Sequence, residues 1–126
     1  MGPERAARVD PLARSLELGV PPAVHSDFPI TPFDPWFTLH TCVNRLTRSG
    51  EVLGPDQRIS AYEALRAFTI TAAMCSFEED IKGTIESGKL ADFIVCDRNM
   101  LEIDPLEIKD IKVLRTVIGG RTVHTA

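Results

Sequence analysis

Residues 82–97 read KGTIESGKLADFIVCD, and this stretch decides the fold. The run from Phe93 to Cys96 is continuously apolar, which is typical of a short strand covered by other structure on both faces. Gly83 and Gly88 come before the run, and glycine permits the tight turns that join short strands. Asp92 can hold a backbone turn directly before the strand. The stretch therefore predicts a turn-rich segment that ends in a buried strand.

The residues that follow continue this β-type pattern. Ile111 to Ile118 is rich in β-branched residues, and Gly119-Gly120 separates it from Arg121 to His124. Two short strands joined by two glycines are typical of a β-hairpin. The segment from Asp104 to Lys109 is predicted to form at most a short helix between strands.

The residues before the deciding stretch predict helices, and three Asp-Pro pairs mark helix starts. Aspartate accepts hydrogen bonds from the free N–H groups of a first helical turn, and proline at the next position loses no donor. The helix after the second pair is expected to end before Ser49-Gly50 and to carry one apolar stripe of Trp36, Leu39, Val43 and Leu46. The three pairs are Asp10-Pro11, Asp34-Pro35 and Asp104-Pro105.

A further helix is predicted to begin after Ser60. Ser60 and Glu63 have the spacing of a capping box, in which each side chain accepts a hydrogen bond from the other residue's backbone. One face of this helix is expected to be buried, and it is formed by Leu65, Phe68, Ala72 and Cys75.

Residues 20–33 contain too many prolines for a helix. Ala23-Val24 can form a short buried strand, whereas Pro29 and Pro32 force the next residues into a stiff irregular loop. We therefore expect Asp27 to lie where a strand ends and a loop begins.

Composition limits the class of protein. The chain has 126 residues, 18 acidic and 14 basic side chains and a net charge of −4. This length fits one domain or part of a larger one, and it is too short for a complete TIM barrel of about 250 residues. The basic residues are scattered among acidic ones, which argues against a nucleic acid partner.

The sequence also bears on the compartment. No apolar run approaches the ~18 residues of a membrane helix, and the charged first ten residues do not resemble a secretory signal. We therefore expect no membrane association and a cytoplasmic location. The three cysteines, Cys42, Cys75 and Cys96, are far apart and each has apolar neighbours, so they are expected to be buried reduced thiols.

Few polar residues are arranged for catalysis. His25 and Asp27 are two residues apart, which on a strand puts both on one face, where they could bind a metal or transfer protons. The pair also fits a turn-forming aspartate beside an incidental histidine. His40 is expected to be structural, and His124 to be solvated. A catalytic zinc site needs three or more protein ligands, whereas these residues offer one histidine near one aspartate.

Four stretches in order resemble the metal-dependent amidohydrolase superfamily, particularly its amidohydrolase-3 branch. The first is similar to the end of that superfamily's last barrel strand, and the second to the helix that follows. The third is similar to the signature where the chain leaves the barrel and re-enters a small β-sandwich, and the fourth to its closing hairpin. The stretches are Ala23–Ile30, Ile59–Thr69, Lys82–Asp97 and Val117–Val123.

The resemblance implies an incomplete α/β fold. Residues 1–78 would form the last strand-helix units of a TIM-like (β/α)8 barrel, and residues 79–126 the C-terminal strands of a composite β-sandwich domain. Such a chain would have open barrel edges and a sandwich without its N-terminal strands.

The resemblance also implies an activity, namely hydrolysis of carbon–nitrogen bonds other than peptide bonds in a small amide-type substrate. It assigns Asp27 the role of the strand-end aspartate that contacts a divalent metal, expected to be zinc, and takes a proton from the attacking water. His25 and Phe28 would flank the substrate pocket. The family's other metal ligands would lie upstream of this sequence, and none of the three histidines stands at their positions.

Three hypotheses follow. In the first, the chain is a C-terminal fragment of an amidohydrolase and is inactive alone, so that it pairs with the missing N-terminal portion or forms a homo-oligomer. In the second, it is a non-catalytic structural or interaction module derived from such an enzyme. In the third, it is one subunit of a two-chain enzyme whose metal site is split between the subunits.

Overall fold

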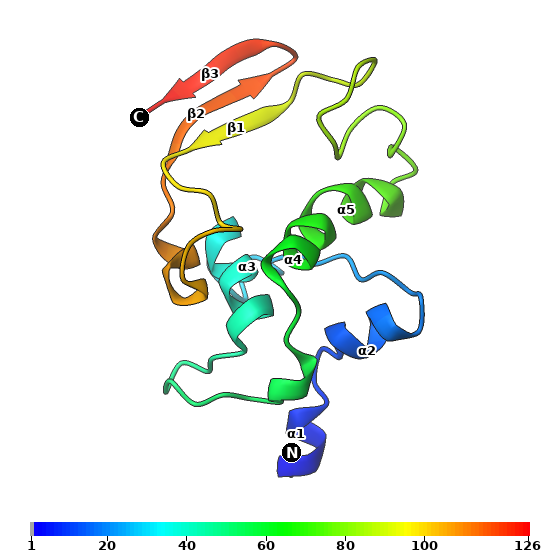
Figure 1. Cartoon of the computed structure of the whole chain (residues 1–126), viewed down its shortest axis with the longest axis vertical. Coiled ribbons are helices and arrows are strands. Elements are labelled where there is room, and N and C mark those ends of the chain that lie inside the picture. Colours follow the sequence, from blue (N-terminus) through cyan, green and yellow to red (C-terminus); the bar gives the residue numbers. More distant parts are fainter. Residues whose placement is uncertain (1) are drawn as a thin grey trace.

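The computed structural model describes residues 2–126 and shows an α/β chain with two regions (Figure 1). The sheet lies at one end of the molecule, and most helices lie together in the middle. The helices are α1 (Pro3–Ala7), α2 (Leu12–Glu17), α3 (Pro35–Asn44), α4 (Ala61–Phe68) and α5 (Ile70–Cys75), with the 3-10 helices η1 (Pro55–Gln57) and η2 (Pro105–Asp110). The strands are β1 (Phe93–Cys96), β2 (Val113–Ile118) and β3 (Arg121–Thr125).

The strands form one antiparallel sheet in the order β1-β2-β3, which confirms the predicted strand and hairpin. Gly119 and Gly120 have φ angles of 56° and 75°, a left-handed pair that suits the two-residue turn of a hairpin. The Asp92 carboxylate accepts a hydrogen bond from the Gly119 N–H at 2.6 Å. Asp92 therefore holds the hairpin turn 27 residues further along the chain, and the prediction that it holds a turn just before β1 was wrong.

The prediction that β1 is covered on both faces was also wrong. Phe93, Ile94 and Val95 are all exposed, although successive side chains point to opposite faces of a strand. Within residues 2–126, no element covers either face of β1 completely. An apolar composition indicates that a strand is suited to burial. It does not show which other part of the structure, if any, covers the strand.

Two of the three predicted aspartate caps are confirmed. Asp34 accepts from the Trp36 N–H at 3.0 Å, and Asp104 accepts from the Leu106 N–H at 2.8 Å. Asp10 instead adopts a left-handed conformation with φ 49°, and Pro11 flanks α2 without a side-chain cap.

The helix after Asp34 ends earlier than predicted. Arg45 is left-handed and terminates α3, so Leu46 lies outside the helix and forms an isolated bridge with Val52. The buried Arg45 guanidinium donates to the carbonyls of Val9, Asp10 and Leu53, which ties the end of α3 to the N-terminal segment. The spacing of apolar residues along the sequence does not predict a long-range contact of this kind.

The predicted helix after Ser60 is divided at Thr69, and its buried face differs from the prediction. Leu65 and Phe68 are half-buried and Cys75 is exposed. Because Thr69 leaves the helical conformation, with φ −117° and ψ −88°, the helix is interrupted there and the predicted stripe is not continuous. The buried positions of the two helices are Ala64, Ala67, Ile70, Thr71 and Ala73.

The cysteines differ in burial, which corrects the prediction that all three are buried. Cys42 is buried, Cys96 is intermediate and Cys75 is exposed. Burial raises the pKa of the Cys42 thiol to about 11, so this cysteine stays protonated at neutral pH.

One core joins the helices to the segment between β1 and β2. Ile108, on η2, is fully buried where η2 packs against α3. Residues on both sides of position 79 therefore share one hydrophobic core, formed by Leu12, Leu39, Cys42, Ile59, Ala64, Met100, Ile108 and Ile111.

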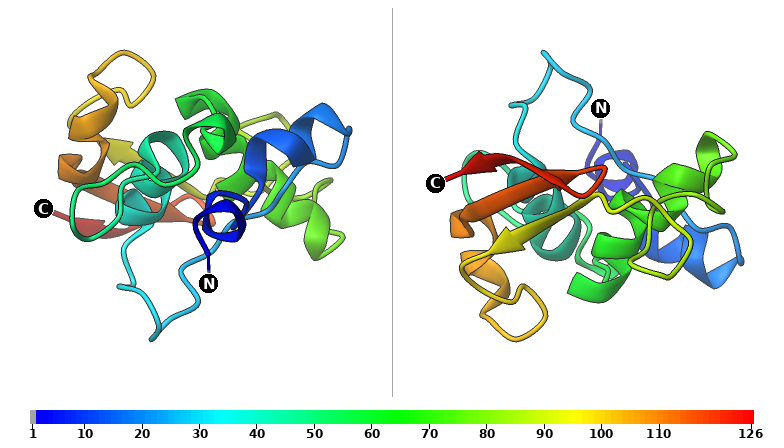
Figure 2. Two further views of the ribbon diagram at one scale, coloured as in Figure 1. Left: turned by 90° about the horizontal axis from the view of Figure 1, so that it is seen from below. Right: turned by 90° about the horizontal axis from the view of Figure 1, so that it is seen from above.

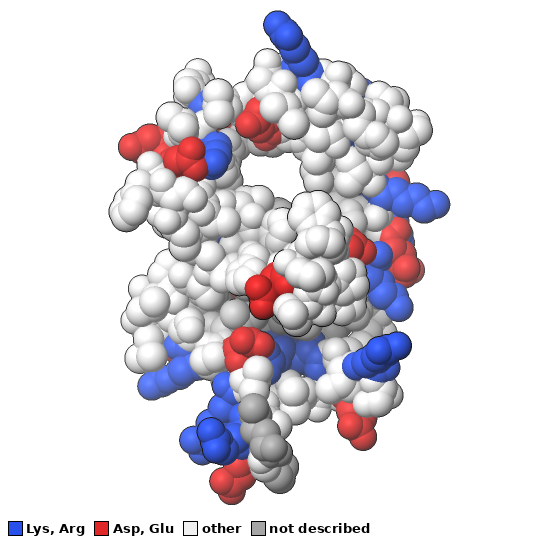
Figure 3. Space-filling view, turned by 180° about the vertical axis from the view of Figure 1, so that it is seen from behind, with Lys and Arg blue, Asp and Glu red and all other residues white. Residues whose placement is uncertain are grey.

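The surface view in Figure 3 shows Lys and Arg side chains interspersed with Asp and Glu on that face. It also shows an opening between the sheet-bearing end and the helices. Among the described residues, the helices are all too short or too polar to cross a bilayer.

The predicted capping box is confirmed and gives a first testable prediction. Glu63 accepts from the Ser60 N–H at 2.7 Å, and the Ser60 hydroxyl accepts from the Glu63 N–H at 3.2 Å. We expect Ser60→Ala to lower the free energy of unfolding by about 1 kcal/mol, measured by urea denaturation. Ser87→Ala, at an exposed turn position, is the matched control and should change it by less than about 0.5 kcal/mol. Equal effects of the two substitutions would contradict the assignment.

Candidate functional site

Asp27 lies at the start of a loop that projects from the molecule. The segment before it is extended, but Ala23 and Val24 form no regular strand in residues 2–126, contrary to prediction. The Val24 N–H instead donates to the Ala67 carbonyl of α4 at 3.3 Å, which holds this segment against the helix. Figure 2 shows the loop between this segment and α3 extending away from the body in both views.

The backbone around Asp27 is held by local hydrogen bonds. Asp27 adopts a left-handed conformation with φ 52°, which aspartate tolerates better than most residues. Its N–H donates to His25 Nδ1 at 2.9 Å, and its carbonyl accepts from the Ile30 N–H at 2.8 Å. The residue is exposed, and within residues 2–126 no hydrogen bond occupies its carboxylate. The carboxylate is therefore accessible to a proton, a cation or a substrate.

His25 is close to Asp27, but its ring is already used. Because Nδ1 accepts the Asp27 N–H, the neutral ring carries its proton on Nε2. The link between the two residues is therefore a side chain to backbone contact, whereas the strand geometry predicted two side chains on one face. His25 is exposed, at the base of the projecting loop.

Phe28 lies on the exposed part of the loop and packs against Phe33. The ring centroids are 5.7 Å apart, and the rings meet edge to face at 77°. The Thr31 hydroxyl donates to the Ser26 carbonyl and closes the base of the loop. Phe28 and Phe33 therefore form an exposed apolar surface on the loop that begins at Asp27.

The described residues supply one candidate metal ligand, but they do not form a complete metal site. In the part of the chain that the structure covers, no group of three or more His, Cys, Asp and Glu side chains could hold an ion. Asp27 offers one accessible carboxylate, which is a suitable oxygen ligand for a divalent cation. The other ligands of any such site would have to lie outside residues 2–126.

His40 is buried on α3, at 8% exposed, which suits the structural role that the sequence predicted. It lies on α3 opposite η2, and its pKa is lowered by burial and by the nearby positive charge of Lys109, with Asp110 acting in the opposite direction. The ring is therefore neutral in the folded state at neutral pH. His124 is exposed on β3, as predicted.

The lowered pKa of His40 predicts a pH dependence of stability. Below the ordinary value of 6.5 the unfolded chain binds a proton that the folded chain does not, so the folded state loses stability as the pH falls. We expect the free energy of unfolding to decrease between pH 7.5 and pH 5.5, and His40→Gln to reduce this slope. His124→Gln, at an exposed histidine, is the control. An unchanged slope in His40→Gln would contradict the prediction.

Lys89 has a structural role that the sequence did not predict. Its half-buried side chain donates from the ammonium to the Glu79 carbonyl at 2.5 Å and to the Thr84 hydroxyl at 2.7 Å. It thereby holds the turn-rich segment after α5. The buried Glu79 Oε2 has no hydrogen-bond partner among the described residues. No local spacing marks these contacts, so only the three-dimensional arrangement reveals them.

The fold is shared with a class of solved hydrolases. The chain is similar to the crystal structure of a metal-dependent hydrolase from Pyrococcus horikoshii OT3, with a TM-score of 0.71 and 31% sequence identity. That alignment covers 83% of this chain and 22% of the hydrolase. The chain also matches the amidohydrolase-3 family model, described as the amidohydrolase family, over residues 1–124. It belongs to this family.

Two curated relatives are similar to the chain. The N-substituted formamide deformylase of Arthrobacter pascens is 36% identical over 110 residues, which cover 87% of this chain and 20% of the deformylase. The protein LONG AFTER FAR-RED 3 of Arabidopsis thaliana is 32% identical over 126 residues, which cover 98% of this chain and 21% of that protein. The chain therefore spans about a fifth of the length of the curated relatives it matches.

Proposed function

We propose that this chain supplies one acidic residue, Asp27, to the active site of a metal-dependent amidohydrolase that hydrolyses carbon–nitrogen bonds of small amides. The observation that carries the proposal is the accessible Asp27 carboxylate, held at the start of an ordered loop in a member of the amidohydrolase family. Catalytic residues of TIM barrels usually lie on loops that follow barrel strands, and Asp27 begins a loop that follows an extended segment.

In this proposal Asp27 has two roles, as a metal ligand and as a proton acceptor. A divalent cation, proposed to be zinc, would lower the pKa of water to about 7 and polarise the amide carbonyl. The Asp27 carboxylate takes a proton from the attacking water and passes it to the leaving nitrogen. His25 would orient the Asp27 backbone through its Nδ1, and Phe28 would contact the substrate.

The same proposal covers the domain organisation. Residues 1–78 would be the last units of the barrel, and residues 79–126 the C-terminal strands of a composite sandwich. The exposed apolar side chains of the sheet support a partner region that covers them, and they include Ile94, Leu114, Ile118 and Val123. The absence of a complete ligand set from residues 2–126 supports inactivity of the chain by itself.

A hybrid enzyme tests this proposal. The hybrid is the Arthrobacter pascens deformylase in which the segment that aligns with this chain is replaced by this chain's residues. We expect the hybrid to bind a divalent metal and to hydrolyse N-substituted formamides, and the isolated chain to do neither. A folded hybrid that binds metal but hydrolyses no amide would contradict the proposed function and favour a non-catalytic module.

A further inference from the structure

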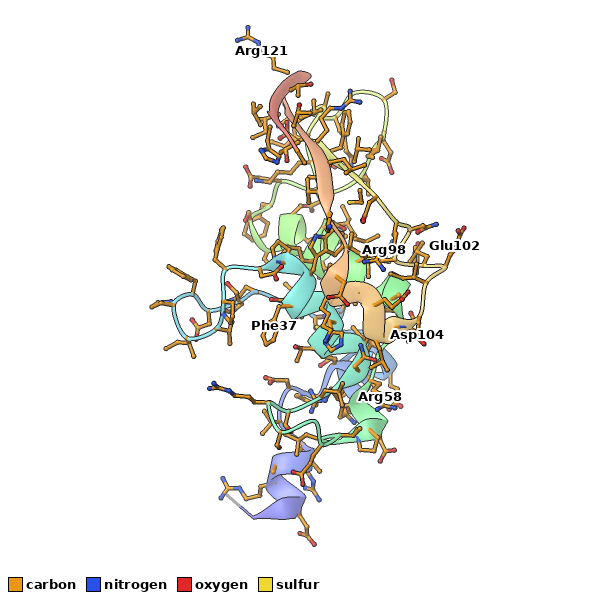
Figure 4. The ribbon with its side chains drawn as sticks, turned by 90° about the vertical axis from the view of Figure 1, so that its left-hand side faces the viewer. Phe37, Arg58, Arg98, Glu102, Asp104 and Arg121 are labelled. Atoms are coloured by element: carbon orange, nitrogen blue, oxygen red, sulfur yellow. The ribbon has the colours of Figure 1, made fainter. Side chains whose placement is uncertain are left out.

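The loop that begins at Asp27 contains a hydrogen bond between residues on either side of that aspartate. Figure 4 shows the loop projecting from the body, with Phe37 on α3 near its base. The Thr31 hydroxyl donates to the Ser26 carbonyl, and both of these residues are half-buried, whereas Asp27 is exposed. The bond closes a ring of backbone that contains Asp27, so a change in the φ angle of Asp27 would separate Thr31 from Ser26.

The peptide group between Ser26 and Asp27 is held at both of its polar atoms. This group is planar, and its carbonyl and N–H point in opposite directions. The carbonyl accepts from the Thr31 hydroxyl, and the N–H donates to His25 Nδ1 at 2.9 Å. Rotation of the peptide group would therefore break two hydrogen bonds at once.

The peptide group after Asp27 is held as well. Its carbonyl accepts from the Ile30 N–H at 2.8 Å. The two flanking peptide groups together fix the direction of the Asp27 Cα–Cβ bond, so only the side-chain torsions remain free. The φ angle of 52° lies in the left-handed region, which is disfavoured for residues other than glycine. These hydrogen bonds therefore maintain a direction of the side chain that the backbone would not favour by itself.

Thr31 is also connected to the core through the start of α3. The Asp34 N–H donates to the Pro32 carbonyl at 2.8 Å, directly after Thr31. The Asp34 carboxylate accepts from the Trp36 N–H at 3.0 Å, and Trp36 packs against the hydrophobic core. The Thr31 hydroxyl therefore links the backbone at Asp27 to a helix whose position the core fixes.

We propose that Thr31 is a positioning residue for the reaction, because its hydroxyl holds the backbone that presents the Asp27 carboxylate. The inference rests on the proposed function of Asp27, and Thr31 acts through the backbone of Asp27. A misplacement of about 1 Å in an active site can lower a rate by about 100-fold. Loss of the hydroxyl should therefore lower kcat, whereas KM should stay nearly unchanged.

Thr31→Val in the hybrid enzyme tests the inference. Valine keeps the β-branched shape of threonine but has no donor for the Ser26 carbonyl. We expect kcat for an N-substituted formamide to fall by about 10-fold or more and KM to change by less than about 2-fold. Thr31→Ser restores the donor and should bring kcat to within about 3-fold of the unmodified hybrid.

Thr41→Val is the matched control. The Thr41 hydroxyl donates to the Phe37 carbonyl at 2.9 Å within α3, so this variant removes a bond of the same kind at a different place. We expect it to change neither kcat nor KM. A kcat in Thr31→Val that equals that of Thr41→Val, while Asp27→Asn is inactive, would overturn the inference.

Amide hydrogen exchange in the 126-residue chain measures the same effect without catalysis. We expect Thr31→Val to raise the exchange rates of the Asp27 and Ile30 N–H groups, measured by NMR, by about 5-fold or more, and Thr41→Val to leave them unchanged. Equal exchange rates in Thr31→Val and the unmodified chain would overturn the inference. Faster exchange in Thr31→Val beside full activity of Asp27→Asn would instead overturn the proposed role of Asp27 and leave the structural effect of Thr31 intact.

Discussion

Replacing Asp27 by asparagine should lower the turnover of the hybrid enzyme by roughly 100-fold or more. Asparagine keeps the size of the side chain and tolerates the left-handed backbone at this position, so the loop should keep its conformation. It cannot accept a proton from water at neutral pH, and it is a weaker metal ligand than a carboxylate. Turnover and bound metal, measured on the same samples, would report the two effects separately.

Asp56→Asn is the matched control for this prediction. Asp56 is exposed on η1, and among the described residues no hydrogen bond or ion pair joins its side chain to the loop at Asp27. We expect its turnover and metal content to equal those of the unmodified hybrid. Asp27→Asn with unchanged melting temperature and near-normal turnover would show that the proton acceptor is another residue.

Replacing Ile108 by alanine should lower the free energy of unfolding of the chain by about 2 to 5 kcal/mol. Ile108 is 0% exposed, and it contributes to the core where η2 packs against α3. The smaller side chain loses buried apolar area and leaves a cavity. Because the free energy of unfolding of small domains is only about 5 to 15 kcal/mol, this loss would remove a large share of the stability of the chain.

Ile85→Ala is the control, because the same side chain there is 84% exposed. We expect it to change the free energy of unfolding by less than about 0.5 kcal/mol in the same urea titration. A loss below about 1 kcal/mol in Ile108→Ala would indicate that η2 separates readily from α3.

The sequence predicted the fold best where the signal is local. Gly119-Gly120 defines the hairpin, and Ser60 with Glu63 defines the start of α4, because each motif is satisfied within a few residues. The prediction was wrong where distant contacts decide. The end of α3 depends on Arg45 and carbonyls up to 36 residues away, and the burial of β1 depends on structure that covers it.

The candidate site was predictable by resemblance rather than by geometry. The Ala23–Ile30 stretch drew attention to Asp27, and the family match over residues 1–124 confirms the family. Strand periodicity gave the wrong relation between His25 and Asp27, because the segment is not a paired strand and Asp27 is left-handed. The role of Lys89 required knowledge of which carbonyl it reaches.

The unpaired edge of β1 has a practical consequence for purification. Among the described residues β1 pairs with β2 alone, so the N–H and carbonyl groups on its other edge have no partner strand, and the four residues Phe93 to Cys96 carry no charge. Uncharged open edges recruit strands from other molecules and can seed fibrils. Samples of the isolated chain should therefore self-associate as they are concentrated, and a lysine placed in this strand would be the simplest way to keep them monomeric.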